Sequence, residues 1–330
     1  MAQTRTKIAL NGFGRIGRSI LRILQQSDWP IDLVLINDIE PLESCAYLFE
    51  YDSVFGPYHG SVEAGAGALV LDGVPIRFTH HSNLAELDLS GVDVVLECTG
   101  LAGNRAVASR GLEAGARKVL ISGPSDTADK TIVLGANDAD LADQRIISNA
   151  SCTTNALAPL ARLLDEAYGV LSGHMTTVHC YTGSQPTVDK PRNDFARSRA
   201  AALSMVPTTT SAQRLVGEVL PKLKGRIEAR AIRVPTASVS AIDLTVQLQA
   251  RFTATDARAR LAEAAEQGPI FGYTDKPLVS SDLRMRPESL IVVGPEISVS
   301  TGGLLRVFGW YDNEWGFSVR MLELAQRMAR

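Results

Sequence analysis

The chain has 330 residues, which exceeds the size at which one hydrophobic core usually stops growing, so two domains are expected. Hydrophobic residues make up 45% and charged residues 21%, and the net charge of −3 gives no reason to expect a nucleic-acid partner or an acidic membrane surface. No apolar run reaches the ~18 residues that a membrane helix needs, and the first run is too short for a signal peptide, so a cytoplasmic protein is expected.

The first half of the chain alternates short β-branched runs with helical stretches. Residues 7–10 and 31–36 are predicted as strands on either side of a helix over residues 14–26. Further strands are predicted over residues 92–96, 118–121 and 131–134, with a helix over residues 106–114. This alternation is typical of a parallel sheet covered by helices, and it places an α/β domain over residues 1–150.

The pattern changes after residue 150. A helix is predicted over residues 153–168, and long alternating runs follow over residues 174–181, 227–234, 239–249 and 304–310. These runs favour a mostly antiparallel sheet, so residues 151–315 are expected to form an α+β domain. Residues 316–330 read as an amphipathic helix that joins the first domain. The loop over residues 183–200 is long and irregular, which is more often functional than idle.

A glycine motif stands between the first predicted strand and the first helix. Gly12, Gly14 and Gly17 give the spacing G-x-G-x-x-G, and Asn37-Asp38 ends the next strand at about the ~20 residues expected of a Rossmann-type dinucleotide site. Asp38 can accept hydrogen bonds from ribose hydroxyls and would repel a 2′-phosphate, so the predicted cofactor is NAD. The alternative is a plain strand–helix turn with Asp38 as a surface carboxylate.

Four cysteines, Cys45, Cys98, Cys152 and Cys180, have no paired spacing, so neither a disulfide framework nor a metal site is expected. Cys98 follows a strand end and is interpreted as a small buried filler. Cys152 stands at the start of the predicted helix 153–168, where the helix dipole and free amides favour a thiolate and lower the thiol pKa. Taken alone, Cys152 could equally be structural.

His179 ends a predicted strand and can serve as the proton acceptor for a nucleophilic Cys152. A thiolate, a base and a nicotinamide cofactor together indicate oxidation of an aldehyde. The thiolate adds to the carbonyl, His179 takes the hydroxyl proton as hydride leaves, and a thioester remains for transfer to a second nucleophile. Several Arg and Thr residues follow in the chain and suggest phosphate binding, although the sequence alone does not bring them together.

These motifs resemble those of the glyceraldehyde-3-phosphate dehydrogenase family over nearly the whole chain. The resemblance is carried by residues 11–18, by Ser148–Asn155 in Ser-Asn-Ala-Ser-Cys-Thr-Thr-Asn, by Arg233-Val234-Pro235-Thr236 and by residues 310–316. It implies a cytosolic homotetramer that uses NAD and inorganic phosphate on a phosphorylated sugar aldehyde, and forms an acyl phosphate.

The resemblance also assigns roles to single residues. Cys152 is the expected nucleophile and His179 the expected base. NAD binding falls to Gly12, Phe13, Gly14, Arg15, Ile16, Asn37, Asp38 and Thr99, with Asn313 at the nicotinamide carboxamide. Thr182, Ser184 and Arg233 match the site for the substrate's phosphate, and Ser151, Thr153, Arg197 and Thr210 match the site for the attacking phosphate. Ser211 replaces a glycine that often contributes an amide there.

Two other functions stay open at this point. Erythrose-4-phosphate dehydrogenase resembles this chain in its Cys and His but releases a free acid by hydrolysis, so its turnover would not need phosphate. A non-catalytic dinucleotide-binding protein would keep the fold and is expected to lose Cys152, His179 or the arginines, all of which are present.

Overall fold

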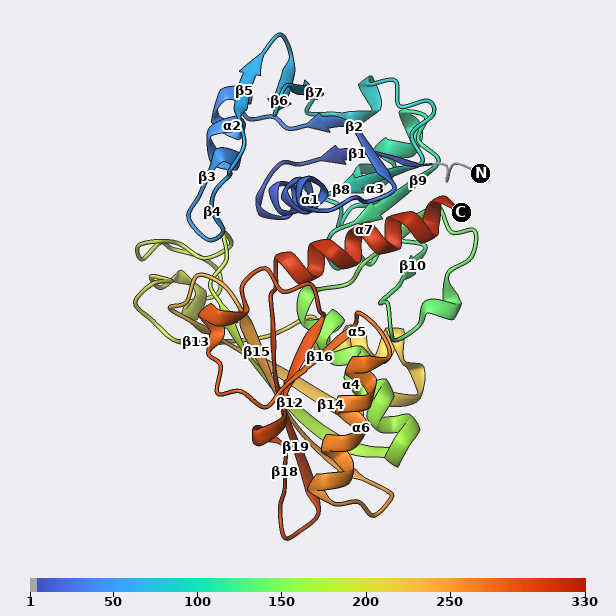
Figure 1. Cartoon of the computed structure of the whole chain (residues 1–330), viewed down its shortest axis with the longest axis vertical. Coiled ribbons are helices and arrows are strands. Elements are labelled where there is room, and N and C mark those ends of the chain that lie inside the picture. Colours follow the sequence, from blue (N-terminus) through green and yellow to red (C-terminus); the bar gives the residue numbers. More distant parts are fainter. Residues whose placement is uncertain (1–4) are drawn as a thin grey trace. The chain divides into compact units, whose positions relative to one another are not determined.

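The computed structural model describes residues 5–330, which fold into two compact units (Figure 1). The first unit runs to Ile132 and also takes Ala139–Ala150 and Ser318–Arg330. The second unit consists of Val133–Asp138 and Ser151–Phe317. Within residues 5–330, no helix combines the length and the apolar character needed to cross a bilayer.

The first unit is built on a nine-stranded sheet with the order β10-β11-β9-β8-β1-β2-β7-β6-β5. Its strands are β1 Thr6–Asn11, β2 Ile31–Asn37, β5 Val62–Gly65, β6 Ala68–Leu71, β7 Val74–Thr79, β8 Val94–Glu97, β9 Lys118–Ile121, β10 Lys130–Thr131 and β11 Ile146–Ser148. Its helices are α1 Arg15–Gln26, α2 Leu42–Glu50, α3 Arg105–Glu113 and most of α7 Trp315–Ala329, and β3 Tyr51–Asp52 pairs with β4 Gly56–Pro57.

Helices cover both faces of the central strands, which explains their continuous apolar sequence. Ala9, Val95 and Val119 share one buried cluster with Ala108 of α3. Leu10 points to the other face, where Gly17 of α1 lies against it. Because successive strand residues face opposite sides, both sets of side chains are buried. The predicted parallel α/β sheet is confirmed for this part of the chain.

The strand order reverses between β8 and β1, since the chain proceeds from β1 to β2 on one side and later returns to β8 on the other. Both neighbours pair with β1 in parallel, so the carboxyl ends of all three strands meet at one edge. In open α/β sheets, ligands bind in the crevice outside such a switch point. Residues that follow β1, β2 and β8 are therefore the first candidates for a ligand site.

Several details of this unit differ from the sequence expectation, and helix α2 and the strand pair of β3 and β4 were not predicted. The strand predicted over residues 131–134 ends at Thr131, because only Lys130 and Thr131 pair with β11 and the buried residues after them turn away. The antiparallel edge of β5, β6 and β7 was not predicted. Its outer strand contains Ala64 and Gly65, which carry little β-strand signal.

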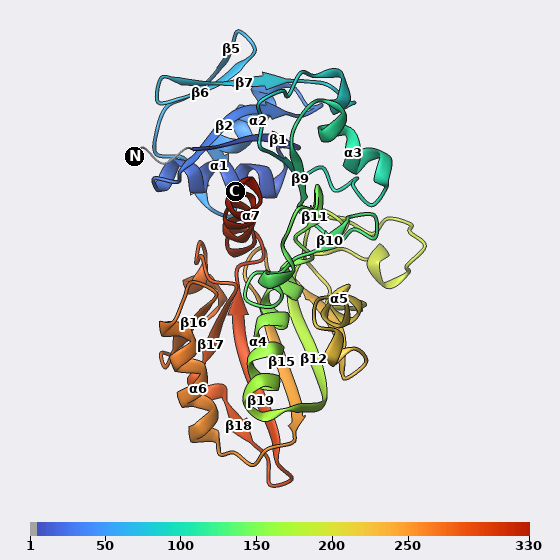
Figure 2. The same cartoon turned by 90° about the vertical axis from the view of Figure 1, so that its right-hand side faces the viewer.

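The second unit is built on an eight-stranded sheet with the order β13-β14-β12-β15-β19-β17-β16, in which β18 also pairs with β19. Its strands are β12 Val170–Cys180, β13 Val206–Thr208, β14 Ile227–Val234, β15 Ser240–Leu248, β16 Phe271–Thr274, β17 Leu290–Val293, β18 Ser298–Val299 and β19 Leu304–Tyr311. Figure 2 shows its helices, α4 Cys152–Tyr168, α5 Ala212–Val219 and α6 Ala254–Glu266, over one face of the sheet.

The mostly antiparallel sheet of this unit is confirmed, with two exceptions. β12 pairs with β14 in parallel, as does β16 with β17. The parallel pairing sets His179 opposite Arg233, which brings a candidate base beside a candidate anion binder. Helices α5 and α6 were not predicted. Helix α5 spans only 8 residues, too short for a clear helical period.

Candidate active site and dinucleotide pocket

The three glycines of the motif have three different surroundings. Gly12 has a φ of +95°, and a Cβ there would lie 2.7 Å from the backbone of Cys98 and Thr99. A Cβ on Gly17 would lie 2.3 Å from the carbonyl oxygen of Gly12. A Cβ on Gly14 would meet nothing within 4 Å. The loop therefore turns at Gly12, packs closely at Gly17 and is open at Gly14, as pyrophosphate binding at a helix start requires.

Asp38 lies where β2 ends and is tied to the glycine loop. Its Oδ2 accepts the backbone N–H of Phe13 at 2.5 Å, and its Oδ1 accepts that of Glu40 at 2.9 Å. These two bonds fix the carboxylate beside the loop while leaving further lone pairs for a ligand. The position agrees with a ribose-binding carboxylate.

A buried network beneath the pocket was missed at the sequence level. Asn11 donates to Glu97 at 2.5 Å, and Asn37 donates to Asn11 Oδ1 at 2.8 Å. Glu97 is buried and also accepts the N–H of Thr99 at 3.0 Å. The network joins the ends of β1, β2 and β8, because each strand contributes one polar side chain. The network holds the crevice in one shape. In the sequence, the only indication of this network is that all three residues stand at predicted strand ends.

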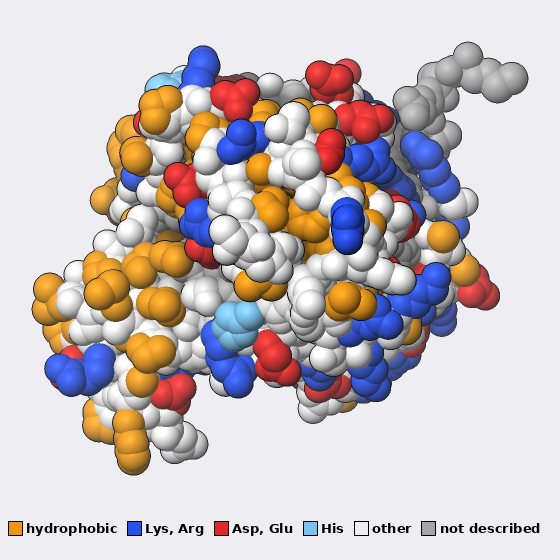
Figure 3. Space-filling view, turned by 90° about the horizontal axis from the view of Figure 1, so that it is seen from below, with side chains coloured by type: hydrophobic (Ala, Val, Ile, Leu, Met, Phe, Trp, Pro, Cys, Tyr) orange, Lys and Arg blue, Asp and Glu red, His pale blue; other side chains and the backbone are white. Residues whose placement is uncertain are grey.

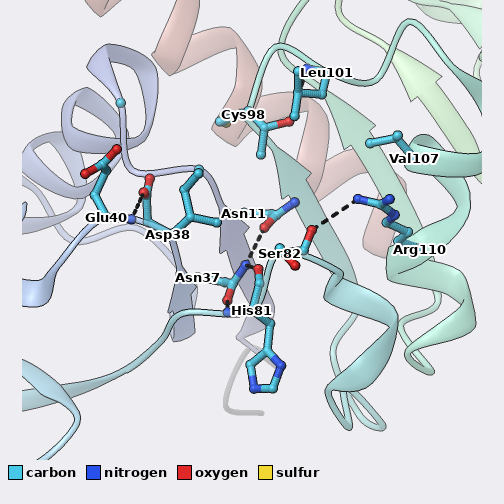
Figure 4. Close-up of a pocket in the computed structure, with 14 residues that line it drawn as sticks. Asn11, Asn37, Asp38, Glu40, His81, Ser82, Cys98, Leu101, Val107 and Arg110 are labelled. Carbon is cyan, nitrogen blue, oxygen red and sulfur yellow. Dashed lines mark hydrogen bonds between the residues drawn. The ribbon is translucent and has the colours of Figure 1, made fainter.

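Figure 4 shows the cavity that these strand ends enclose, with a volume of about 300 Å³. Asp38 and Glu40 lie on one side, and Val107 and Arg110 of α3 lie on the other. Arg110 donates to the carbonyl oxygen of Ser82 at 3.2 Å, which holds its guanidinium at the rim. Further residues lining the cavity are Asn11, Gly12, Gly14, Asn37, Ile39, His81, Ser82, Cys98, Thr99 and Leu101. An open phosphate loop beside a carboxylate fits a dinucleotide.

Cys98 lines this cavity and is partly exposed as a residue, but its thiol is buried, as expected of a filler. Burial raises the pKa of this thiol to about 12. Cys98 is therefore a neutral, unreactive side chain at neutral pH.

Cys152 is the first residue of α4, as the sequence predicts. Ser151 caps the helix with an extended backbone, and its Oγ accepts the N–H of Thr154 at 3.1 Å. Ala150 before it has a φ of +56°, a conformation that side chains rarely adopt and that turns the chain sharply into the helix. The cap and the turn place the Cys152 thiol among the free amides of the first helical turn.

His179 lies beside Cys152, with 3.6 Å between Nε2 and Sγ. Nδ1 of the ring lies 2.7 Å from the carbonyl oxygen of Cys180 and 2.8 Å from Nη1 of Arg233. Arg233 also reaches the Cys180 carbonyl, at 3.0 Å, so this oxygen can accept from both groups. A carbonyl oxygen only accepts, so its 2.7 Å contact puts a proton on Nδ1, and Arg233 then donates to that oxygen and not to the ring. Nε2 is left free to accept the thiol proton.

The electrostatics of the pair correct one expectation. Burial raises the pKa of the Cys152 thiol above its usual value, although Arg233 and the first amides of α4 act in the opposite direction. Burial, followed by the charge of Arg233, lowers the pKa of His179 to about 4. The predicted lowering of the thiol pKa is therefore wrong, because the helix start is too poorly hydrated. At neutral pH the pair rests as thiol and neutral imidazole, and the imidazole can accept the proton.

The candidate phosphate ligands fall into two groups in the second unit. Thr182 and Ser184 bond to each other at 2.8 Å, just beyond β12. Arg197 donates to Thr208 Oγ1 at 2.6 Å, and the N–H of Ala212 donates to Thr210 Oγ1 at 3.3 Å. Strand β14, which carries Arg233, runs between β12 and β13 and so separates these two groups.

Thr153 and Ser211 each have a particular placement. Thr153 is buried, and its Oγ1 lies 2.9 Å from the hydroxyl of Tyr311, so its hydroxyl faces the protein interior. Ser211 stands before α5 with a φ of −64°, an ordinary value for any residue. A serine there supplies the same backbone N–H as a glycine, without strain.

Asn313 is held by two residues that the sequence analysis did not select. Its Oδ1 lies 3.1 Å from the thiol of Cys180 and 3.1 Å from the hydroxyl of Ser240. No local spacing could have shown this contact, because the three residues come from separate segments of the second unit.

Comparisons with known proteins agree with this geometry. Residues 6–105 match the NAD binding domain of glyceraldehyde 3-phosphate dehydrogenase, and residues 151–313 match its C-terminal domain. The chain is 46% identical over 329 residues to the glyceraldehyde-3-phosphate dehydrogenase of Cereibacter sphaeroides, with 98% of each chain covered. It belongs to the glyceraldehyde-3-phosphate dehydrogenase family. The predicted family and the predicted NAD cofactor are thereby confirmed.

Two other relatives show the same likeness. The glyceraldehyde-3-phosphate dehydrogenase of Pseudomonas aeruginosa is 47% identical over 329 residues, with 98% of each chain covered. Glyceraldehyde-3-phosphate dehydrogenase 1 of Bacillus subtilis is 42% identical over 330 residues, again with 98% of each chain covered. The family match therefore extends over both structural units.

Proposed function

We propose that the chain oxidises D-glyceraldehyde 3-phosphate to 1,3-bisphosphoglycerate with NAD and inorganic phosphate, through a thioester on Cys152. The observation that carries this proposal is the 3.6 Å approach of Cys152 Sγ to His179 Nε2 at a capped helix start. A thiol beside a neutral imidazole is the pair that covalent aldehyde oxidation needs.

The first unit would hold NAD through the loop Gly12–Ile16 and through Asn37, Asp38 and Thr99. Of these residues, Gly12, Gly14, Asn37, Asp38 and Thr99 line the cavity. On this proposal, residues 1–150 with the helix 316–330 bind the cofactor, and residues 151–315 carry the chemistry. Asn313 would contact the nicotinamide carboxamide. When bound, NAD supplies the hydride acceptor for the oxidation.

The residues of the second unit account for the bond changes. The Cys152 thiol gives its proton to Nε2 of His179 as sulfur bonds to the aldehyde carbon, and the imidazolium protonates the oxyanion. His179 then takes the hydroxyl proton of this hemithioacetal while the carbon loses hydride, which leaves a thioester and an imidazolium. Phosphate displaces the sulfur, the imidazolium returns its proton to the thiolate, and the acyl phosphate leaves with the phosphate proton lost to water.

Two anion sites would orient the reaction. Thr182, Ser184 and Arg233 would bind the phosphate of the substrate. Ser151, Arg197, Thr210 and the amides of Thr153 and Ser211 would bind the attacking phosphate. Arg233 already lies 2.8 Å from His179, so a phosphate bound there would be close to the base. Forked guanidinium donors suit phosphate oxygens.

We further propose a cytoplasmic homotetramer. The segment before β13, residues 183–205, exposes large apolar side chains: Val188 is 74%, Phe195 87%, Leu203 84% and Met205 74% exposed. Figure 3 shows hydrophobic side chains gathered on the left, the side on which Figure 1 draws this loop. An apolar patch on a surface loop suits a subunit interface. If the tetramer forms through this loop, Phe195→Ser should lower the mass measured by light scattering. A wild-type chain that is already monomeric by the same measurement would contradict the proposed assembly.

A steady-state assay tests the reaction. NADH formation from glyceraldehyde 3-phosphate should require phosphate or arsenate. If erythrose 4-phosphate were turned over faster than glyceraldehyde 3-phosphate, and at a rate that does not depend on phosphate, the chain would instead be a hydrolytic erythrose-4-phosphate dehydrogenase. A chain that binds NAD but turns over neither aldehyde would instead be a non-catalytic dinucleotide-binding protein.

A further inference from the structure

Cys180 and Ser240 converge on one oxygen atom of Asn313. Cys180 ends β12, directly after His179, and is only 1% exposed. Its Sγ lies 3.1 Å from Asn313 Oδ1, and Ser240 Oγ lies 3.1 Å from the same atom. Ser240 begins β15, the strand that pairs with β12, so the two donors reach the amide from neighbouring strands.

The surroundings decide which end of the amide faces inwards. Ser240 Oγ accepts the backbone N–H of Cys180 at 3.2 Å, so its own proton is directed at Asn313. A thiol is a weak acceptor and a better donor here, because burial raises the pKa of Cys180 to about 12 and keeps the sulfur protonated. If the amide were turned round, its NH₂ group would face these two donors. The carbonyl oxygen must therefore point inwards.

The other end of the amide is left for a ligand. Within residues 5–330, Asn313 Nδ2 donates to no protein atom, and it is not among the buried polar atoms that lack a partner. Asn313 itself is 6% exposed, so its NH₂ group reaches a small opening rather than open solvent. An amide NH₂ only donates, so the group it recognises must be an acceptor such as a carbonyl oxygen.

We propose that Cys180 and Ser240 are positioning residues that lock the Asn313 amide with its NH₂ group outwards, so that it donates to the carbonyl oxygen of the nicotinamide carboxamide. This inference rests on the proposed role of Asn313 in cofactor binding. It deepens that role, because it states which end of the carboxamide Asn313 reads and which two side chains enforce the choice.

Four variants test the lock: Cys180→Ala, Cys180→Ser, Ser240→Ala and the double variant Cys180→Ala/Ser240→Ala. Loss of one neutral hydrogen bond should raise the KM for NAD about fivefold, with kcat little changed. Cys180→Ser keeps a hydrogen-bond donor on a slightly shorter side chain, so its KM for NAD should lie closer to wild type than that of Cys180→Ala. The KM for NAD of the double variant should be higher than that of either single alanine variant.

Two ligand analogues separate positioning from general damage. ADP-ribose lacks the nicotinamide, so its Kd should be unchanged in all four variants. Thionicotinamide adenine dinucleotide carries a sulfur, a weaker acceptor than oxygen, in place of the carboxamide oxygen. The wild type should discriminate against it, and the double variant should discriminate less because its Asn313 amide is free to rotate.

Asn313→Ala distinguishes failure of this inference from failure of the proposed function. If Asn313→Ala leaves the KM for NAD unchanged, Asn313 does not bind the carboxamide and that part of the proposed function falls. If Asn313→Ala raises the KM but the double variant keeps both the KM and the analogue selectivity, only the lock is wrong. A parallel loss of ADP-ribose affinity in the Cys180 and Ser240 variants would also overturn it.

Discussion

Replacing two glycines of the same loop by alanine should separate fold stability from NAD binding. A Cβ on Gly17 would lie 2.3 Å from the Gly12 carbonyl oxygen and 3.2 Å from Leu10, so backbone must move. Overpacking of this kind costs about 3 kcal/mol at the upper end, and alanine recovers up to about 1 kcal/mol of helix propensity. Gly17→Ala should therefore destabilise the protein by about 2 kcal/mol.

Gly14→Ala is the matched control for stability. A Cβ there meets no protein atom within 4 Å, and the φ of −72° suits alanine. Its stability should stay within about 0.5 kcal/mol of wild type, as for most surface substitutions. The new methyl group would nonetheless stand where the pyrophosphate approaches, and NAD binding should weaken at least about tenfold, equivalent to about 1.4 kcal/mol.

Urea unfolding of the NAD-free protein, followed by tryptophan fluorescence, measures the first effect, and NAD titration measures the second. Gly17→Ala should lose both stability and affinity, because the shifted Gly12 carbonyl belongs to the phosphate loop. The reasoning would be refuted by a Gly14→Ala variant that binds NAD as wild type does, or by a Gly17→Ala variant that unfolds at the wild-type urea concentration.

Three further predictions follow from the sites. Arg233→Gln removes a cation that lowers the pKa values of both Cys152 and His179, so both should rise, and the alkaline limb of iodoacetamide labelling should move to higher pH; an unmoved limb would contradict this. Asp38→Gly should lower the preference for NAD over NADP in competition kinetics. An unchanged preference would show that other residues determine the cofactor selectivity. Ser211→Gly should leave the KM for phosphate within about twofold, since the backbone amide is retained and the Ser211 side chain makes no capping hydrogen bond; a larger change would give the Ser211 hydroxyl a role.

The glycine loop could be predicted in detail because its physics is local. Gly12 needs a positive φ, Gly17 needs close backbone packing, and Asp38 directly follows the adjacent strand. Each requirement depends on residues that are close together in the sequence. The start of α4 at Cys152 could be predicted for the same reason, since Ser151 is a capping residue.

Other features depend on distant parts of the chain. Cys180 and Asn313 are 133 positions apart, and the contact arises only when strands pair. The raised pKa of Cys152 follows from burial, which its helix-start position did not reveal. Strands β5 to β7 and helix α5 were missed because they are short or carry weak periodicity.

The thioester on Cys152 can be measured directly. Rapid mixing of the NAD-saturated protein with glyceraldehyde 3-phosphate, in the absence of phosphate, should give a burst of one NADH per chain. Acid quenching and peptide mass spectrometry should then find the acyl group on Cys152, while a His179→Asn variant should form it far more slowly. A wild-type chain that turns over with no burst, or with the acyl group on another residue, would contradict the account.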